Sequence, residues 1–268
     1  MASNLIRIFT ITVKDLLRQK SFYVLLAVAL FFVLLLRSCY HGNYSLNGQP
    51  VKPESLAFHA ALIAFHVVAA GMFLMTTMLS MGMVSRDRED GSMVMFLSRA
   101  VDRWQYMLGR IAGTWVLSTI FMFILHLAIA LIVRANTGTP VAGFLTASLL
   151  CSVNLLFAIL LTWTLSLFLP NVMAALFTLI IIGVGFVSDG AYQLMHSDML
   201  HQMAAGQGQT SLWRILFPKV YMFQDFASTW ITHRAFDAMP QAYVGLNVLF
   251  YTAALAAIAL WRFYRSEI

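Results

Sequence analysis

Residues 135–188 read ANTGTPVAGFLTASLLCSVNLLFAILLTWTLSLFLPNVMAALFTLIIIGVGFVS and contain no charged side chain. With a rise of about 1.5 Å per residue, one helix over this stretch would be far longer than the roughly 20 residues that cross a bilayer. Pro170 cannot donate a backbone hydrogen bond, and it disfavours helical geometry in the residue before it. We therefore expect a tight turn at Pro170-Asn171, which divides the stretch into two antiparallel helices.

The composition of the whole chain indicates a membrane protein. Of its 268 residues 10% are charged and 60% are hydrophobic, whereas about a quarter are charged in soluble domains. Six apolar stretches approach or exceed the length of a membrane crossing. They cover residues 22–40, 56–84, 111–133, 141–169, 171–188 and 242–261. We therefore predict an all-α integral membrane protein, with six transmembrane helices in one domain over residues 1–268.

The basic residues predict the orientation of these spans. Short loops rich in Lys and Arg stay on the cytoplasmic side of a membrane. Of the 17 basic residues, 11 fall at the termini or in the loop at 85–110, all on one side of a six-span bundle: Arg7, Lys14, Arg18, Lys20, Arg86, Arg88, Arg99, Arg103, Arg110, Arg262 and Arg265. We therefore expect both termini, and this loop, to be cytoplasmic in the inner membrane.

Residues 1–20 have the pattern of an amphipathic helix. Its basic face carries Arg7, Lys14 and Arg18. The predicted apolar stripe consists of Leu5, Phe9 and Leu16, flanked by Ile6, Val13 and Leu17, with Ile8 and Ile11 towards the polar side. Such a helix lies on a membrane surface, where its basic face meets anionic headgroups. Membrane lipids are therefore expected partners, whereas a nucleic-acid partner is not expected.

Three polar side chains fall well inside the predicted spans: His66, His126 and Asn154. Polar groups within hydrocarbon must find partners. They either form hydrogen bonds across helix contacts, or line a translocation path or ligate a metal or haem. The sequence leaves both interpretations open.

The loop at residues 85–110 reads as a helix, a turn and a second helix. Asp90-Gly91-Ser92 is a start signal for the first, and Met93, Phe96 and Leu97 give it a small apolar face. The charged residues 86–90 are expected to keep the connection in water, and Asp102-x-x-Gln105 resembles a capping box that opens the second helix. The apolar face either rests on the bilayer surface or binds a partner.

The chain carries no familiar catalytic motif. The phosphate loop G-x-x-x-x-G-K-[ST], the nucleophile motif G-x-S-x-G and the zinc motif H-E-x-x-H are all missing from the sequence. We therefore expect a chain that is not an enzyme and binds no cofactor or metal of its own, so the energy for any work comes from elsewhere.

The order of residue types from 89 to 110 carries a family resemblance. An acidic run with Gly-Ser is followed by an apolar helix, a small basic turn, an aromatic residue and Leu-Gly-Arg. These are Glu89-Asp90-Gly91-Ser92, Met93 to Leu97, Ser98 to Arg103, Tyr106 and Leu108-Gly109-Arg110. The segment resembles the loop between the second and third spans of the ABC type-2 exporter permeases. This chain has Ala100 where the family usually has proline, and Arg110 where it has lysine.

The resemblance extends over the whole chain and implies a mechanism. In the family, two permease chains, identical or homologous, pair around a central path, and two separate ATPase subunits that hold ATP and Mg²⁺ dock below. Each ATPase would grip the helix at residues 91–99, with the N-terminal helix as a second contact. The implied ATPase contacts are Glu89, Gly91, Met93, Phe96, Leu97 and Arg99. The outer loop at 189–241 would hold apolar segments, within 211–230, that fold back into the membrane interface.

Three other classes of protein remain open on sequence grounds. A membrane redox protein would use His66 and His126 as haem ligands. A membrane hydrolase would need carboxylates or paired histidines in its spans, whose interiors lack Asp and Glu. A scaffold or secretion subunit would keep the loop at 85–110 but would not transport a cargo. The sequence does not identify the cargo.

Overall fold

The computed structural model describes residues 2–39, 45–46, 49–50, 53–83, 87, 101–138, 142–195, 217–232, 235–236 and 239–265. Apart from one short antiparallel pair of strands, the regular elements in these ranges are helices. They are α1 (Ala2–Arg18), α2 (Lys20–Cys39), β1 (Ser45–Leu46), β2 (Gln49–Pro50), α3 (Pro53–Ser80), α6 (Arg103–Thr137), α7 (Ala142–Ser166), α8 (Asn171–Met195), α11 (Val220–Thr232) and α12 (Gln241–Arg265).

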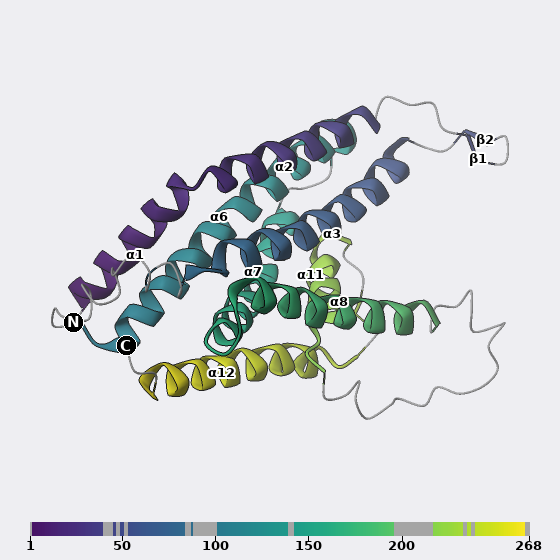
Figure 1. The fold of residues 1–268 in the computed structure, drawn as a ribbon. Helices are drawn as coiled ribbons and strands as arrows, with labels where there is room; N and C mark the ends of the chain where they lie inside the picture. The colour runs from purple at the N-terminus through teal and green to yellow at the C-terminus, as the bar shows by residue number, and fades with distance from the viewer. Residues whose placement is uncertain are drawn as a thin grey trace.

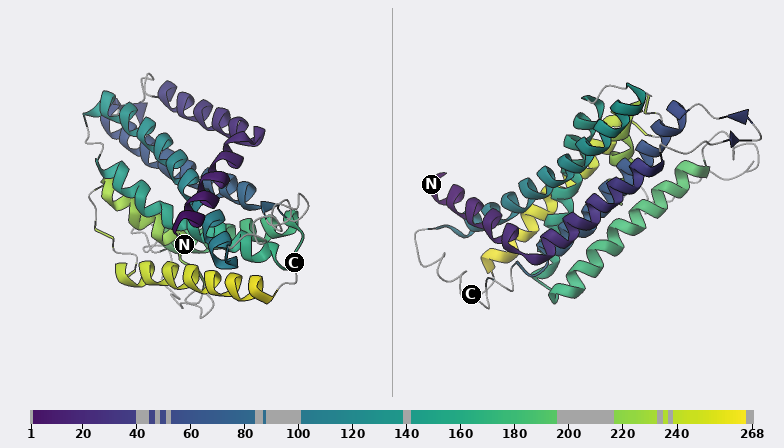
Figure 2. Two further views of the ribbon diagram at one scale, coloured as in Figure 1. Left: turned by 90° about the vertical axis from the view of Figure 1, so that its left-hand side faces the viewer. Right: turned by 90° about the horizontal axis from the view of Figure 1, so that it is seen from above.

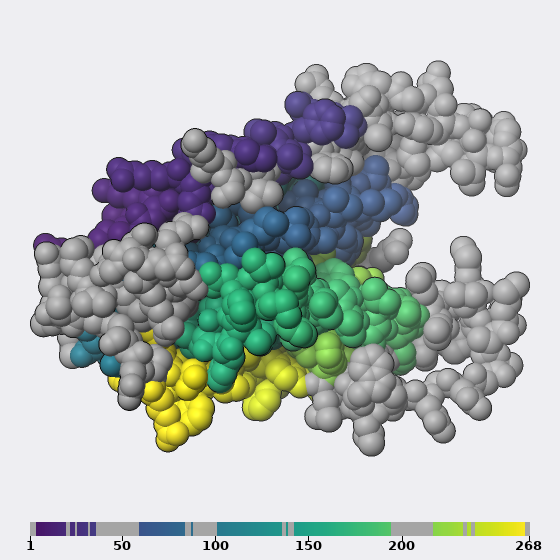
Figure 3. Space-filling view, in the orientation of Figure 1, coloured from purple at the N-terminus to yellow at the C-terminus, as the bar shows by residue number. Residues whose placement is uncertain are grey.

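Five of these helices, α3, α6, α7, α8 and α12, are long and apolar enough to cross a membrane. A sixth crossing results if α1 and α2, which are bent by 65° relative to each other, count as one broken span. Exposed side chains on α8, such as Val172, Ile180 and Val187, are apolar and suit contact with lipid. The chain is therefore an all-α integral membrane protein. Figure 3 shows α8 (green) across the middle of the visible face and α12 (yellow) below it.

The long uncharged stretch forms two helices, as the sequence predicts. α7 ends at Ser166 and α8 begins at Asn171, and the carbonyl of Pro170 accepts the first backbone hydrogen bond of α8 from Ala174 (2.9 Å). α7 lies at the centre of the bundle, where it contacts α3, α6, α8, α11 and α12. Its position explains why its side chains are apolar on nearly every face.

Helix α6 is longer than the span predicted at 111–133. It begins at Arg103, with Asp102 as the N-cap residue, and ends before Gly138 in left-handed geometry. Its 35 residues extend for about 52 Å, against a hydrocarbon core of about 30 Å. The helix therefore projects beyond the membrane. The predicted capping box is not formed, because the Asp102 side chain caps no backbone N–H and Gln105 Oε1 accepts no hydrogen bond. Gln105 Nε2 instead donates to the Asp102 side chain at Oδ2 (3.2 Å).

Both chain termini lie at the same end of the bundle, and the β1–β2 pair lies at the opposite end (Figure 1). We call these the termini end and the hairpin end. Viewed from the termini end, α1 crosses in front of α6 at a steep angle to α2 (Figure 2). The first turns of α6 lie at the termini end, since Arg103 Nη1 donates to the carbonyls of Phe263 (3.2 Å) and Tyr264 (2.9 Å) at the end of α12.

Candidate functional site: the buried charge cluster at the termini end

Two glycines on α6 let α1 approach its backbone closely. A Cβ atom on Gly109 would lie 2.7 Å from Cγ2 of Ile8, and one on Gly113 would lie 2.8 Å from Cβ of Thr12. The Thr12 hydroxyl donates to the carbonyl of Ile8 in its own helix (2.8 Å), so that its methyl group faces Gly113. Small residues four apart on a helix create such a groove for a second helix. α1 is therefore docked on α6.

The predicted faces of α1 need one correction. Arg7, Lys14 and Arg18 are exposed, but Ile8, which the sequence placed towards the polar side, is buried, and Ile6, predicted beside the apolar stripe, is 60% exposed. The reason is that the glycine groove on α6 selects the face that is buried. The remaining apolar side chains of α1, including Leu17, stay exposed and are available to lipid.

A cluster of charged side chains lies under this helix pair. Arg110 Nη2 is 2.6 Å from Asp87 Oδ1, and Arg110 Nη1 is 3.2 Å from Asp15 Oδ2. The Tyr106 hydroxyl donates to the second oxygen of Asp87. The side chains of Arg110 and Asp87 are 7% and 9% exposed, while that of Asp15 is 48% exposed. A charged pair that is this well buried is costly to break, because either partner alone would be an uncompensated charge.

The cluster joins three parts of the chain. Asp87 belongs to the segment that follows α3, Arg110 and Tyr106 belong to α6, and Asp15 belongs to α1. The sequence predicts that Asp87 lies in water with the rest of residues 86–90. That expectation is wrong for Asp87, because the guanidinium of Arg110 supplies a buried partner that a local reading of the loop does not reveal.

The structure leaves the predicted ATPase contacts untested. Glu89, Gly91, Met93, Phe96, Leu97 and Arg99 all lie outside the described residues, as does the predicted helix at 91–99. The structure does show the start of the loop, at Asp87, and its end, at residues 101–102.

The cluster continues into the aromatic core of the termini end. The rings of Tyr106 and Phe263 are stacked with centroids 6.0 Å apart, and Trp163 of α7 packs against Phe263 at 5.3 Å. Together with the Arg103 hydrogen bonds, these contacts fasten the first turns of α6 to α7 and α12.

The three polar residues predicted for a translocation path make contacts between helices. His126 of α6 is fully buried and stacks on Phe65 of α3 with ring centroids 4.4 Å apart. Its Nδ1 lies 3.0 Å from Oγ of Ser148 on α7, and its Nε2 lies 3.4 Å from the carbonyl oxygen of Phe65. Both ring nitrogens therefore already have protein partners.

His66 and Asn154 both contact α11. Asn154 Nδ2 donates to the carbonyl of Val220 (3.0 Å), and Gln224 Nε2 lies 3.0 Å from Nδ1 of His66. The structure thus brings His66 and Asn154 to one helix and places His126 between α3 and α7. These contacts match the first of the two interpretations, hydrogen bonding across helix contacts.

A second buried ion pair holds the start of α11. Lys219 Nζ is 2.9 Å from Asp189 Oδ1 of α8, with side-chain exposures of 1% and 2%. The backbone N–H of Lys219 donates to Oδ1 of Asn247 on α12 (2.9 Å). The sequence alone gives no sign of this pair, because Lys219 and Asp189 lie 30 residues apart. α11, which falls partly within the apolar segments expected at 211–230, packs against α7, with Met222 and Gln224 among its buried side chains.

The chain matches a known family over almost its entire length. A comparison with the sequences of curated proteins gives no significant match. The family match covers residues 6–268 and carries the description ABC-2 family transporter protein. It includes every helix that contributes to the charge cluster. With its bundle of apolar helices, the chain therefore belongs to the ABC-2 transporter family and is a permease subunit of an ATP-binding cassette transporter.

Proposed function

We propose that the chain is the permease of an exporter, that two permease chains pair around the transport path, and that separate ATPase subunits drive them through the loop at 85–110. The observation that best supports coupling through this loop is the buried ion pair of Asp87 and Arg110. ATP and Mg²⁺ would be held by the partner subunits, since this chain lacks a phosphate loop. The cytoplasmic orientation of both termini, in an inner membrane, is part of the proposal.

The cluster supplies a route for mechanical coupling. A push on the loop moves Asp87, and Asp87 is bound to Arg110 on the helix that runs through the whole bundle. Arg110 also binds Asp15, so that α1 follows the same movement. Packed and hydrogen-bonded elements shift as rigid bodies rather than deform smoothly. Movement of the ATPases would therefore tilt α6 and α1 together.

The proposed ATPase contacts follow from the family resemblance of the loop. Phe96 and Leu97 would be the apolar anchors, beside Met93, with Glu89 and Arg99 at the polar rim and Gly91 at the close-approach position. A few apolar side chains usually dominate such interfaces. The exposed basic face of α1, with Arg7, Lys14 and Arg18, would lie at the anionic headgroups next to this contact.

The experiment compares two substitutions on the same side of the proposed membrane. The tagged full-length chain is cross-linked in native membranes and purified, and subunits with a phosphate loop are identified by mass spectrometry. Phe96→Asp should abolish recovery of the ATPase and the ATP hydrolysis that accompanies it. Phe168→Asp is the control, because Phe168 is an exposed phenylalanine in the turn before α8. Retained ATPase recovery with Phe96→Asp would refute the assignment of the loop.

Pairing of two permease chains needs its own measurement. Two copies that carry different tags are expressed together in native membranes, and one tag is used for purification after mild cross-linking. Recovery of the other tag at the mass of a two-chain complex is expected if identical chains pair. If a different permease chain of the family is recovered in its place, the transporter is a heterodimer, and recovery of a single chain contradicts pairing.

For His66, His126 and Asn154 we propose a structural role between helices rather than a role in the translocation path. We expect these residues to hold α3, α7 and α11 together, because each of them has a hydrogen-bond partner on a neighbouring helix. Haem ligation by His126 would require loss of its contacts with Ser148 and Phe65. A purified chain is therefore expected to show no visible absorbance band, and a Soret band would revive the redox alternative.

A further inference from the structure

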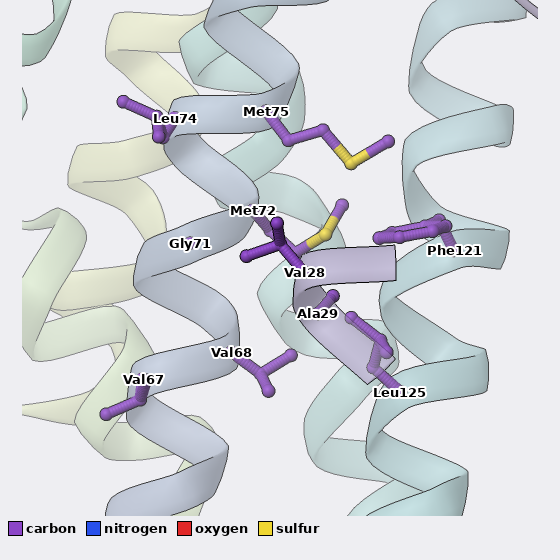
Figure 4. Close-up of a pocket in the computed structure, with 10 residues that line it drawn as sticks. All are labelled: Val28, Ala29, Val67, Val68, Gly71, Met72, Leu74, Met75, Phe121 and Leu125. Carbon is purple, nitrogen blue, oxygen red and sulfur yellow. The ribbon is translucent and has the colours of Figure 1, made fainter. Parts of the chain in front are cut away.

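A cavity of about 360 Å³ lies between α2, α3 and α6. Figure 4 shows Val68, Met72 and Met75 pointing from α3 towards α6, while α2 crosses in front. The lining residues are Val28, Ala29, Val67, Val68, Gly71, Met72, Leu74, Met75, Phe121 and Leu125. Every one of these residues is apolar.

The cavity has a buried floor and an exposed rim. Met72, Met75 and Phe121 are buried, whereas Val28, Val67 and Leu74 are 49%, 50% and 43% exposed. The rim residues belong to α2 and α3, so the cavity opens outward between these two helices. Its position near the middle of the α3 span, which runs from residue 59 to 80, places the opening at the depth of the hydrocarbon core.

The chemistry of the walls restricts what can enter. A lipid headgroup, a peptide or a chain of water molecules needs hydrogen-bond partners at this depth, and the lining side chains have none to offer. Empty space among apolar side chains forfeits dispersion contacts, whereas hydrocarbon lies directly outside the rim. The unbranched, polarizable side chains of Met72 and Met75 adapt readily to a flexible apolar guest.

The position and size of the cavity restrict the occupant further. The cavity is open on the side of the bilayer, where lipid acyl chains are the apolar groups at hand. A single hydrocarbon chain is narrow and flexible enough. We propose that the cavity binds the acyl chain of a membrane phospholipid that enters between α2 and α3. This site is independent of the ATPase contact and goes beyond the proposed function.

Two glycines make a matched test possible. Gly71 lines the cavity and is exposed, and a Cβ atom there would meet no atom within 4 Å, so Gly71→Leu adds apolar bulk at the rim of the cavity without a clash at its Cβ. Gly183 on α8 is equally free of neighbours and does not line the cavity. Gly183→Leu therefore adds the same side chain to a membrane helix elsewhere.

The experiment uses the full-length chain in membranes that contain a phosphatidylcholine with a photoactivatable diazirine near the end of one acyl chain. After irradiation, labelled peptides are quantified by mass spectrometry, and labelling of Met72 and Met75 is divided by labelling of exposed Ile180. We expect the wild type to be labelled at the buried methionines. Gly71→Leu should remove most of this labelling, and Gly183→Leu should leave the ratio unchanged.

Three results would overturn the proposal. They are an absence of label at Met72 and Met75 in the wild type, a ratio that Gly71→Leu does not lower, and an equal loss in both variants. Size-exclusion chromatography of each variant shows whether the chain is folded. Gly71→Ala is made as well, as a milder substitution at the same position. A folded Gly71→Leu chain that is still labelled at the methionines excludes the acyl-chain site.

Discussion

Substitution of Gly113 by alanine tests whether α1 is fastened to α6. The added Cβ would lie 2.8 Å from Cβ and 2.9 Å from Cγ2 of Thr12, and 3.3 Å from the carbonyl oxygen of Phe9. Because the nearest atoms belong to a short side chain next to its backbone, rotation of that side chain does not relieve the clash. The two helices must move apart.

The comparison with Gly71→Ala isolates the clash. Both substitutions remove a helix-interior glycine, and each gains a similar 0.5–1 kcal/mol or so of helix propensity. A Cβ atom added at Gly71 has no atom within 4 Å. The difference in stability between the two variants is therefore the cost of overpacking at Gly113. That cost is typically about 1–3 kcal/mol.

Trypsin measures the detachment of α1, because Lys14 and Arg18 are exposed and become good substrates once the helix opens locally. When opening is fast relative to cleavage, the rate follows the population of the open form. In detergent, cleavage after these residues should be about 5- to 150-fold faster in Gly113→Ala than in Gly71→Ala. Equal rates in the two variants would refute close packing of α1 on α6.

Three further substitutions probe the buried polar groups, with thermal stability of the purified chain as the common measurement. Arg110→Met should cost about 3–5 kcal/mol, because it leaves the Asp87 carboxylate buried without its cation, and addition of Asp87→Asn should recover most of the loss. Lys219→Met should destabilise the chain to a similar degree, with recovery by Asp189→Asn; no recovery would contradict the importance of the pairing. His126→Phe should cost about 1–3 kcal/mol and leave transport activity largely intact, whereas complete loss of transport in a folded chain would restore His126 to the path.

The features that the sequence predicts well are local ones. Pro170 disfavours helical geometry in the residue before it, and the chain breaks there between α7 and α8. Asp102 is the N-cap residue of α6, although its side chain makes no capping hydrogen bond. Such signals depend on a few neighbouring residues. The membrane class follows in the same way from hydropathy, because each crossing must satisfy its own backbone hydrogen bonds.

The features that sequence analysis misses depend on partners far along the chain. In the sequence Asp87 is one of several charged residues in a polar run, and only the structure shows that it pairs with Arg110. Lys219 likewise pairs with Asp189, which lies 30 residues away in the sequence. One signal was available, however. Gly109 and Gly113 stand four residues apart at the start of an apolar helix, the spacing with which helices approach closely in membranes. This spacing indicates a close helix contact at the start of α6, and the structure identifies the partner as α1.

The start of α2 is tied to the bundle through both α1 and α6. α1 is held on α6 by the glycine groove and the Asp15–Arg110 contact, and α2 leaves it after a bend of 65°. Beyond Phe22, α2 stands beside the apolar cavity and has exposed side chains along much of its described length. A movement of α6 would therefore carry α1 with it, and the start of α2 would follow, because buried Phe22 packs against Phe121 of α6 with ring centroids 5.6 Å apart. Phe121, which makes this contact, also lines the apolar cavity, so the contact of α2 with α6 and the wall of the cavity share one side chain.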